Sequence, residues 1–213
     1  MVSFTTSSWI AMFRGAIDEI RGHHSLLSEL DSVGGDGDHG TTMNRAMASI
    51  EKVLDAAAPQ TVEKLLNDVG WAILGVDGGA IGPLLGMFFV SMAAKLQEKT
   101  PVDNLDWAAV FKAGLAGVRE QTQAQPGDKT LIDALLPAVD TLAEKLMDSL
   151  SPEEALHSSA VAAAEGAEQT ATMQARFGRA KHIKEKSIGS RDPGATSVAL
   201  LFRGFEKGLK DHA

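Results

Sequence analysis

Segments whose apolar residues recur at helical spacing make up most of this chain. In the first of them, Ile10, Phe13 and Ile17 return every three or four residues, which indicates one buried face of an α-helix. Similar segments follow as far as the C-terminus, separated by short stretches that contain glycine or proline. No segment alternates like a β-strand, and no internal repeat is evident. The pattern predicts an all-α protein, an antiparallel up-and-down bundle or barrel of about eight helices.

The glycine and proline positions divide the chain into the expected helices. These cover about residues 5–24, 40–57, 61–74, 83–94, 104–125, 129–149 and 152–177, with a short helical turn at 26–30. A last helix, entered from the turn at residues 192–194, carries the apolar residues from Val198 to Leu209. The fourth is apolar nearly all round, so we expect it to be buried. The apolar run 80–94 is interrupted by Gly82, Pro83 and Gly86 and is too short to span a membrane.

Composition supports a helical core and narrows the function. The 213 residues suit one domain, 1–213, and the 44% hydrophobic content includes only 5% aromatic residues and no tyrosine. A net charge of −8 offers no basic field for nucleic acid. Cysteine is absent, which excludes disulfides and thiolate chemistry. The N-terminus lacks the basic and apolar regions of a signal peptide, so we expect a cytoplasmic protein without a membrane segment.

Every second connection between the expected helices is rich in glycine and charge. These connections are the segments 31–40, 75–83, 126–129 and 184–194, whereas the intervening ones look like plain links. In an up-and-down arrangement, alternate connections lie at the same end of the molecule. The sequence therefore predicts one functional site at that end.

Three carboxylates lie close together in the first of these loops. Asp31, Asp36 and Asp38 surround a run of glycines, and a long apolar-periodic segment begins directly afterwards. Hard oxygen ligands of this kind suit Mg²⁺, which commonly binds carboxylate and phosphate oxygens together. An EF-hand is excluded, because counting from Asp36 places Thr41 where glycine is required and Met47 where glutamate is required. A solvated acidic turn is the remaining alternative.

Other loop residues suggest an anion site beside these carboxylates. Amides and hydroxyls of residues 39–42 stand at an expected helix start, where phosphate binds readily, although Thr41 or Thr42 could equally cap the helix. Lys129 follows Gly127 and Asp128 but lacks the first glycine and the strand of a P-loop. It could still neutralise phosphate, and the alternative is a solvated lysine at a helix start. Asp192 reads most simply as the N-cap of the last helix.

Four motifs in order resemble the dihydroxyacetone kinase L-subunit family across essentially the whole chain. They are Gly35-Asp36-Gly37-Asp38-His39-Gly40, Gly78-Gly79-Ala80 with Gly82-Pro83-Leu84, Pro126-Gly127-Asp128-Lys129-Thr130, and Ser187-Ile188-Gly189 with Asp192-Pro193-Gly194-Ala195-Thr196-Ser197. The resemblance implies an eight-helix barrel that holds ADP or ATP at one end. It also implies two Mg²⁺ ions bound by Asp31, Asp36 and Asp38.

The resemblance further implies which residues contact the nucleotide. Carried over position by position, these are His39, Gly40, Thr41, Thr42, Ala80, Ile81, Thr122, Leu131, Arg179, Asp192, Pro193 and Gly194. Taken alone, Arg179 would be interpreted as a surface residue. No residue is expected to act as a catalyst in its own right, because metal and charge positioning suffice for phosphoryl transfer.

The implied activity is that of a kinase subunit. It would transfer a phosphoryl group to dihydroxyacetone or a related ketose held on a separate K-type subunit. A phosphotransferase-system donor protein and a homodimer are further partners consistent with the family. The alternative is a non-catalytic nucleotide-binding regulator or coactivator.

This chain departs from the family pattern at several positions. Ile81 stands where a serine hydroxyl usually reaches phosphate, Leu131 replaces a methionine, and Thr122 replaces a common glycine. The run 180–187 also differs from the usual Ala-Ser-Tyr-Leu-Gly-Glu-Arg-Ser. We expect a divergent member, with Ile81 costing one charge-assisted hydrogen bond of roughly 1–3 kcal/mol.

Overall fold

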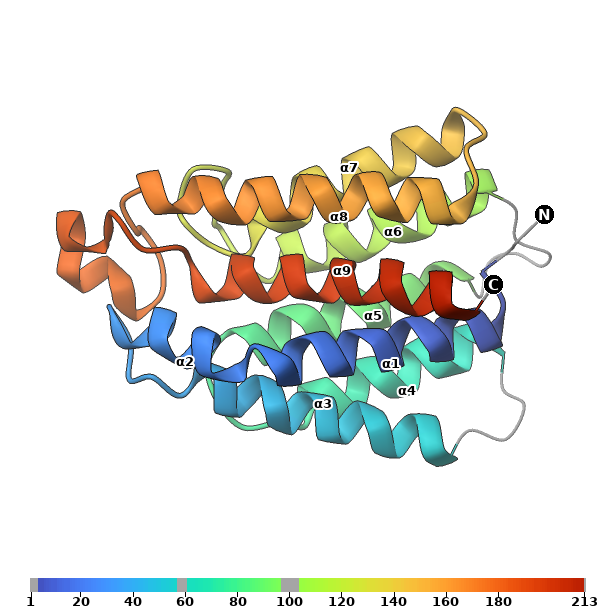
Figure 1. The fold of residues 1–213 in the computed structure, drawn as a ribbon, viewed down its shortest axis with the longest axis horizontal. Coiled ribbons are helices and arrows are strands. Elements are labelled where there is room, and N and C mark those ends of the chain that lie inside the picture. The colour runs from blue at the N-terminus through green and yellow to red at the C-terminus, as the bar shows by residue number, and fades with distance from the viewer. Residues whose placement is uncertain (1–3, 57–60, 97–103, 213) are drawn as a thin grey trace.

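The computed structural model describes residues 4–56, 61–96 and 104–212, and within them it is helical with no strand. Eight helices pack side by side in a closed ring, each against the next in chain order, and the last packs against the first. Figure 1 shows them running alternately in opposite directions along the long axis. The predicted eight-helix up-and-down barrel is confirmed.

One short additional helix, α2, lies between α1 and α3 in the sequence and packs on α3 and α9. The α-helices are α1 (Thr6–Gly22), α2 (His24–Ser32), α3 (His39–Ala56), α4 (Val62–Leu74), α5 (Ile81–Leu96), α6 (Asn104–Glu120), α7 (Ile132–Met147), α8 (Pro152–Gln169) and α9 (Pro193–His212). Two 3₁₀ helices, η1 (Thr170–Thr172) and η2 (Arg179–Ser187), lie between α8 and α9.

The closure of the ring between α1 and α9 depends on glycine. A Cβ atom added to Gly204 would lie 2.3 Å from the Cα atom of Ala16, and one added to Gly15 would lie 2.2 Å from the carbonyl oxygen of Gly204. Any side chain larger than hydrogen would push the two backbones apart. The first and last helices therefore touch along their main chains.

Aromatic side chains fill the half of the barrel that lies away from the glycine-rich loops. Trp9 stacks on Phe111 with ring centroids 5.8 Å apart, and Phe205 meets Phe13 edge-on at 5.6 Å. All four are fully buried. Methionines at helical spacing on α3, Met43 and Met47, are likewise buried core residues.

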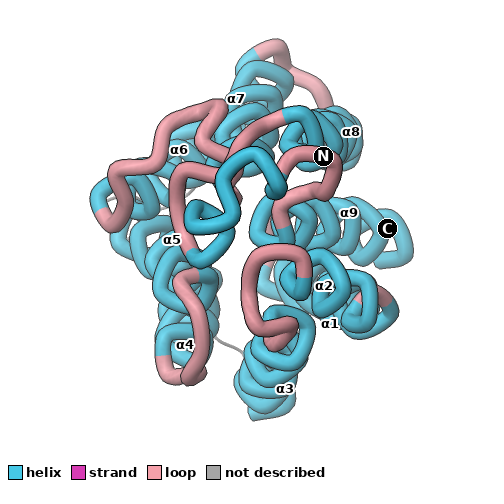
Figure 2. The backbone as a smooth tube through the Cα atoms, turned by 90° about the vertical axis from the view of Figure 1, so that its left-hand side faces the viewer, coloured by secondary structure: helices cyan, strands magenta, loops and turns pink. Residues whose placement is uncertain are grey.

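The four glycine-rich connections meet at one end, as the alternation predicts. Figure 2 looks onto this end, where the loops before α3, α5, α7 and α9 cross the mouth of the ring. The segment 170–192 is the longest of them and carries η2, the orange-red projection at the left of Figure 1. We call this the loop end.

Local signals at helix boundaries are borne out where they are strong. Ser151 and Glu154 form the expected capping box at the start of α8. The Asp192 carboxylate accepts a 2.7 Å hydrogen bond from the Ala195 amide, as an N-cap does. Helix α5 is buried nearly all round, and Pro83 lies in its first turn.

Several predicted boundaries were wrong. The expected helix 104–125 ends at Glu120, the helix 129–149 begins only at Ile132, and the helix 152–177 ends at Gln169. Part of the expected loop 184–194 belongs to η2. The end predicted at Ala57 lies outside the described residues. Among the described helices, none is both long and apolar enough to cross a bilayer.

Candidate nucleotide and metal site

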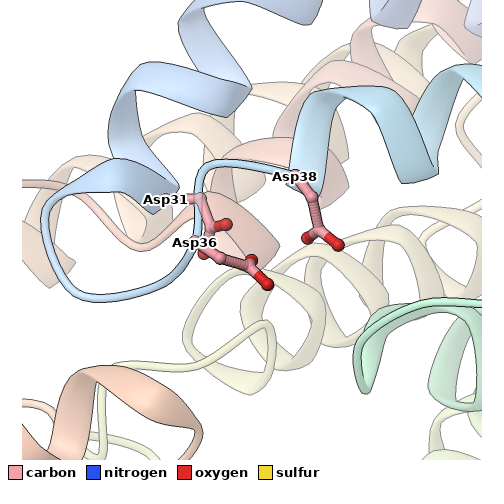
Figure 3. Close-up of side chains that lie close together, drawn as sticks. All are labelled: Asp31, Asp36 and Asp38. Carbon is pink, nitrogen blue, oxygen red and sulfur yellow. The ribbon is translucent and has the colours of Figure 1, made fainter.

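Asp31, Asp36 and Asp38 bring their carboxylates together at the loop end. Asp31 lies in the last turn of α2, and the other two lie in the loop that leads into α3. One oxygen atom from each lies within 4.8 Å of the others. Figure 3 shows the three side chains directed into the space beneath the loop. A cluster of three hard oxygen donors fits a divalent cation such as Mg²⁺.

Two glycines allow the loop to fold around Asp31. The Gly37 amide donates a 2.9 Å hydrogen bond to the Asp31 carboxylate, with a backbone φ of 76° that glycine adopts without strain. A Cβ atom on Gly35 would lie 2.2 Å from the other carboxylate oxygen of Asp31. The glycines predicted from the sequence are thus needed to place the acidic cluster.

Arg179 supplies a cation to this cluster from η2. Its guanidinium forms an ion pair with Asp36. Desolvation is the largest single influence and acts to raise the pKa of Asp36, but hydrogen bonds with Arg179 and Asp38 and the charge of Arg179 together outweigh it and lower the pKa below its ordinary value. Desolvation and the neighbouring Asp36 raise the pKa of Asp38. A bound metal ion and Arg179 would therefore compete for the same carboxylate.

His39 begins α3 and joins it to α9. Its Nε2 atom lies 2.8 Å from the hydroxyl oxygen of Ser197, which is fully buried. Burial lowers the pKa of His39, and the charge of Asp31 opposes this only in part. A neutral imidazole follows, fixed at the N-terminus of a helix where amides favour an anion.

A cavity of about 300 Å³ opens beside the acidic cluster, a size at the lower end of small-molecule sites. The predicted site residues that line it come from all four loops. They are Asp31, Asp38, His39, Thr42, Ala80, Ile81, Thr122, Leu131, Arg179, Asp192, Pro193 and Gly194. Residues separated by most of the chain are thus gathered around one space.

Three predicted site residues do not line this cavity. Gly40 faces α2, where a Cβ atom would lie 2.1 Å from the His24 carbonyl oxygen. Thr41 is exposed, and Asp36 belongs to the acidic cluster at the cavity edge. The lack of a side chain at Gly40 therefore allows α2 to pack closely on α3.

The start of α5 faces the acidic cluster across the cavity. Ile81 is buried there, with 6% of its surface exposed, and its side chain forms part of the cavity wall. The first-turn amides of α5 have no acceptor within the helix. The position offers backbone donors to an anion while presenting an alkyl group where a hydroxyl would add another donor.

Part of the cavity wall is apolar. Leu131 precedes α7, and the segment between η1 and α9 adds Phe177 and Ile183, which the sequence did not single out as site residues. Their signal was weak, because Phe177 looked like the end of a helix. An apolar slot of this kind suits a flat aromatic base.

Asp192 stands at the edge of this wall. Desolvation by the surrounding protein raises its pKa to about 7, while hydrogen bonds from Ala195 and the charge of Lys129 act in the opposite direction. Lys129 also lines the cavity but is buried, with 5% of its surface exposed. The sequence identified it only as a candidate phosphate partner.

The loop end therefore combines a cluster of three carboxylates, two helix N-termini and apolar cavity residues. In the comparison with known proteins, residues 33–207 match the family model described as the DAK2 domain. The chain belongs to the DAK2 domain family. Its DAK2 fold accounts for the glycine-rich motifs, since all of them border the cavity or shape the loops around it.

The chain is similar to two DAK2 relatives over almost their whole length and to a longer kinase over part of its length. The chain is 38% identical to the PEP-dependent dihydroxyacetone kinase ADP-binding subunit DhaL of Escherichia coli, over 87% of this chain and 88% of that protein. It is 34% identical to a protein of the same description from Listeria innocua, over 92% of each. It is also 35% identical to L-erythrulose 1-kinase of Mycolicibacterium smegmatis, covering 86% of this chain and 32% of that one.

Solved structures share the fold. The native dihydroxyacetone kinase of C. freundii superposes with a TM-score of 0.75 and 27% identity, over 97% of this chain. The complex of that kinase with AMP-PNP and Mg²⁺ gives a TM-score of 0.73. This chain spans about a third of the length of those structures, at 36% and 33%.

Proposed function

We propose that this protein is the nucleotide-binding L subunit of a dihydroxyacetone-type kinase. It would hold ADP or ATP with two Mg²⁺ ions at the loop end and present the terminal phosphoryl group to a small hydroxyketone on a separate K-type subunit. The observation that carries this proposal is the gathering of three carboxylates and two helix N-termini around one cavity.

The acidic cluster would hold the metal ions. Asp31, Asp36 and Asp38 offer oxygen donors within one coordination sphere, and metal bound there would neutralise negative charge on the transferring phosphoryl group. The protein carries a net charge of −8, so a nucleotide polyphosphate would be repelled without such cations. The geometry fits the ligand chemistry of Mg²⁺.

The remaining cavity residues would position the nucleotide. Amides at the start of α3 and α5 would donate to phosphate oxygens, with neutral His39 held by Ser197. Arg179, released from Asp36 when metal binds, could then pair with phosphate. Leu131 and the turn 192–194 would bound the base. Positioning and charge stabilisation supply most of what phosphoryl transfer requires.

The names of the relatives support dependence on a partner subunit. The relatives are named as subunits of a kinase. The phosphotransferase-system dependence in the name of the Lactococcus lactis relative suggests that bound ADP could be rephosphorylated in place by a donor protein.

The test uses Asp36→Asn and Asp38→Asn. Each substitution removes a charged ligand, so we expect Mg²⁺-dependent ADP binding to weaken by at least about a hundredfold and phosphoryl transfer with a K-type subunit to be lost. Calorimetric titration measures the binding, and circular dichroism checks that the helices persist. Asp140→Asn, at an exposed position on α7, is the matched control and should bind ADP normally.

Two results would count against the proposal. Wild-type binding in both variants would show that the acidic cluster holds no metal in the nucleotide site. ADP binding without transfer to dihydroxyacetone or L-erythrulose, with any K-type partner, would instead favour a nucleotide-binding regulator. The alkyl side chain of Ile81 in the cavity wall is the observation that favours this second function. Native mass spectrometry of the purified protein would show whether ADP is retained.

A further inference from the structure

Lys129 occupies an unfavourable position for a lysine. Its backbone adopts a left-handed conformation, with φ of 61°, which glycine or asparagine would adopt more readily. Its side chain is buried, with 5% of the residue surface exposed, and burial lowers its pKa. Glycine would form the same turn without the backbone strain. A strained backbone and a buried charged side chain both cost free energy, and together they point to a role for the ammonium group.

The ammonium group of Lys129 joins three segments that are distant in the sequence. It donates a 2.8 Å hydrogen bond to the carbonyl oxygen of Thr170, at the end of α8, and another to the carbonyl oxygen of Ser190, just before α9. Lys129 itself belongs to the loop before α7. One side chain thus connects two of the four connections that form the loop end.

Thr170 links the Lys129 ammonium group to the start of α9 through hydrogen bonds. It is fully buried, and its hydroxyl oxygen accepts a 2.8 Å hydrogen bond from the Asp192 amide. The Asp192 carboxylate in turn caps the helix through the Ala195 amide. Removing the ammonium group would leave two carbonyl groups without this donor and free the segment that carries Asp192.

The connected segments form the wall assigned to the base. A Cβ atom on Gly194 would lie 3.5 Å from the Cβ atom of Leu131, so the loop before α7 and the start of α9 are in contact at the cavity. We propose that Lys129 is a positioning residue of the nucleotide site. Its ammonium group holds Leu131 and the turn 192–194 in the arrangement that receives the adenosine part of the ligand. This inference rests on the proposed nucleotide site.

A direct bond to phosphate is the competing role for Lys129, and nucleotides of different length separate the two. A positioning role acts on the adenosine moiety, so Lys129→Met should weaken AMP and ADP binding by the same factor, about tenfold or more. A direct phosphate contact would weaken ADP much more than AMP. Competition against a fluorescent ADP analogue, with Mg²⁺ present, measures both affinities.

A second variant separates the ammonium group from the backbone. Lys129→Gly relieves the left-handed conformation but also lacks the donor, so we expect it to melt at a higher temperature than Lys129→Met and to bind AMP and ADP equally weakly. If Lys129→Met fails to fold, Lys129→Gly decides the question. Lys52→Met, at an exposed site on α3, is the control and should match the wild type.

The outcomes distinguish this inference from the proposed function. Failure of the wild-type protein to bind ADP with Mg²⁺ would overturn the proposed function and, with it, this role. Wild-type ADP binding together with unchanged affinities in both Lys129 variants would overturn only the positioning role. A loss confined to ADP would also overturn it and assign Lys129 to phosphate. Faster amide exchange at Asp192, Gly194 and Ala195 in either variant would support the role, because a general loss of stability would not confine the change to these residues.

Discussion

The two cations that line the cavity, Arg179 and Lys129, are held differently. Arg179 is exposed and pairs with Asp36 of the acidic cluster, so a bound metal ion could take its place. Lys129 is buried and bonded to two carbonyl oxygens, and its charge opposes the rise in the pKa of Asp192 without cancelling it. Only Arg179 is therefore placed for exchange with a ligand.

Asp192 gives a prediction for pH dependence. Its folded pKa of about 7 exceeds the value of about 3.9 in an unfolded chain, so the folded protein binds more protons between these values. Stability therefore falls as pH rises from 4 to 7. Asp192→Asn keeps a capping oxygen without the charge. We expect this variant to match the wild type near pH 4 and to gain about 1–3 kcal/mol at pH 8.

Urea unfolding at both pH values measures this difference. Asp192 keeps some contact with solvent through the cavity, which is why the expected gain is smaller than the full pKa shift would give. Asp140→Asn should show no such pH-dependent gain. Equal stability of Asp192→Asn and the wild type at pH 8 would contradict the raised pKa.

Among the helices, the α1–α9 contact tolerates the least change. Gly204→Ala would place a methyl group 2.3 Å from the backbone of Ala16, so the helices must separate. We expect a loss of about 1–3 kcal/mol or more in the free energy of unfolding. Gly22→Ala, at the end of α1, meets no atom within 4 Å and should be neutral or slightly stabilising. Denaturant unfolding of the two variants checks the contrast, and equal stabilities would refute it.

Helices could be predicted from the sequence where their signals are local. Apolar periodicity and the capping box at Ser151 located most of the barrel. The end of α8 could not be predicted, because no glycine or proline marks Gln169. The helix ends where Thr170 bonds with Lys129 and Asp192, and those partners are distant in sequence. Similarly, α6 ends before Gln125, because the Thr122 hydroxyl oxygen accepts a hydrogen bond from the Ala124 amide in a turn.

The candidate site was predictable in its residue types but not in all its contacts. The carboxylates and glycines of the first loop indicate a candidate metal site from their residue types alone. The alternation of glycine-rich connections predicts that this loop lies at the same end as the other three. The apolar wall formed by Phe177 and Ile183 depends on how segment 170–192 folds over the cavity, which local patterns do not encode. The roles of the individual site residues remain predictions.

At the scale of the whole molecule, the two ends of the barrel should respond differently to insertion. A short Gly–Ser insertion in the α7–α8 connection, residues 148–151, lies at the end away from the site and should leave ADP affinity within about twofold of the wild type. The same insertion between Pro126 and Lys129 should abolish binding, because it displaces Leu131 and the Lys129 ammonium group. Calorimetry with ADP and Mg²⁺ compares them, and equal affinities would contradict a site confined to the loop end.

The pairing of the first helix with the last has a consequence for how the protein is made. During synthesis α1 emerges before the other helices of the ring, yet its glycine-lined face must wait for α9, the last of them. The cavity is lined by residues between Leu30 and Gly194, so it also needs the start of α9. A partly synthesised chain can form neighbouring helix pairs but has no complete site. The capacity to bind a nucleotide should arise in a single late event, after the C-terminal helix leaves the ribosome.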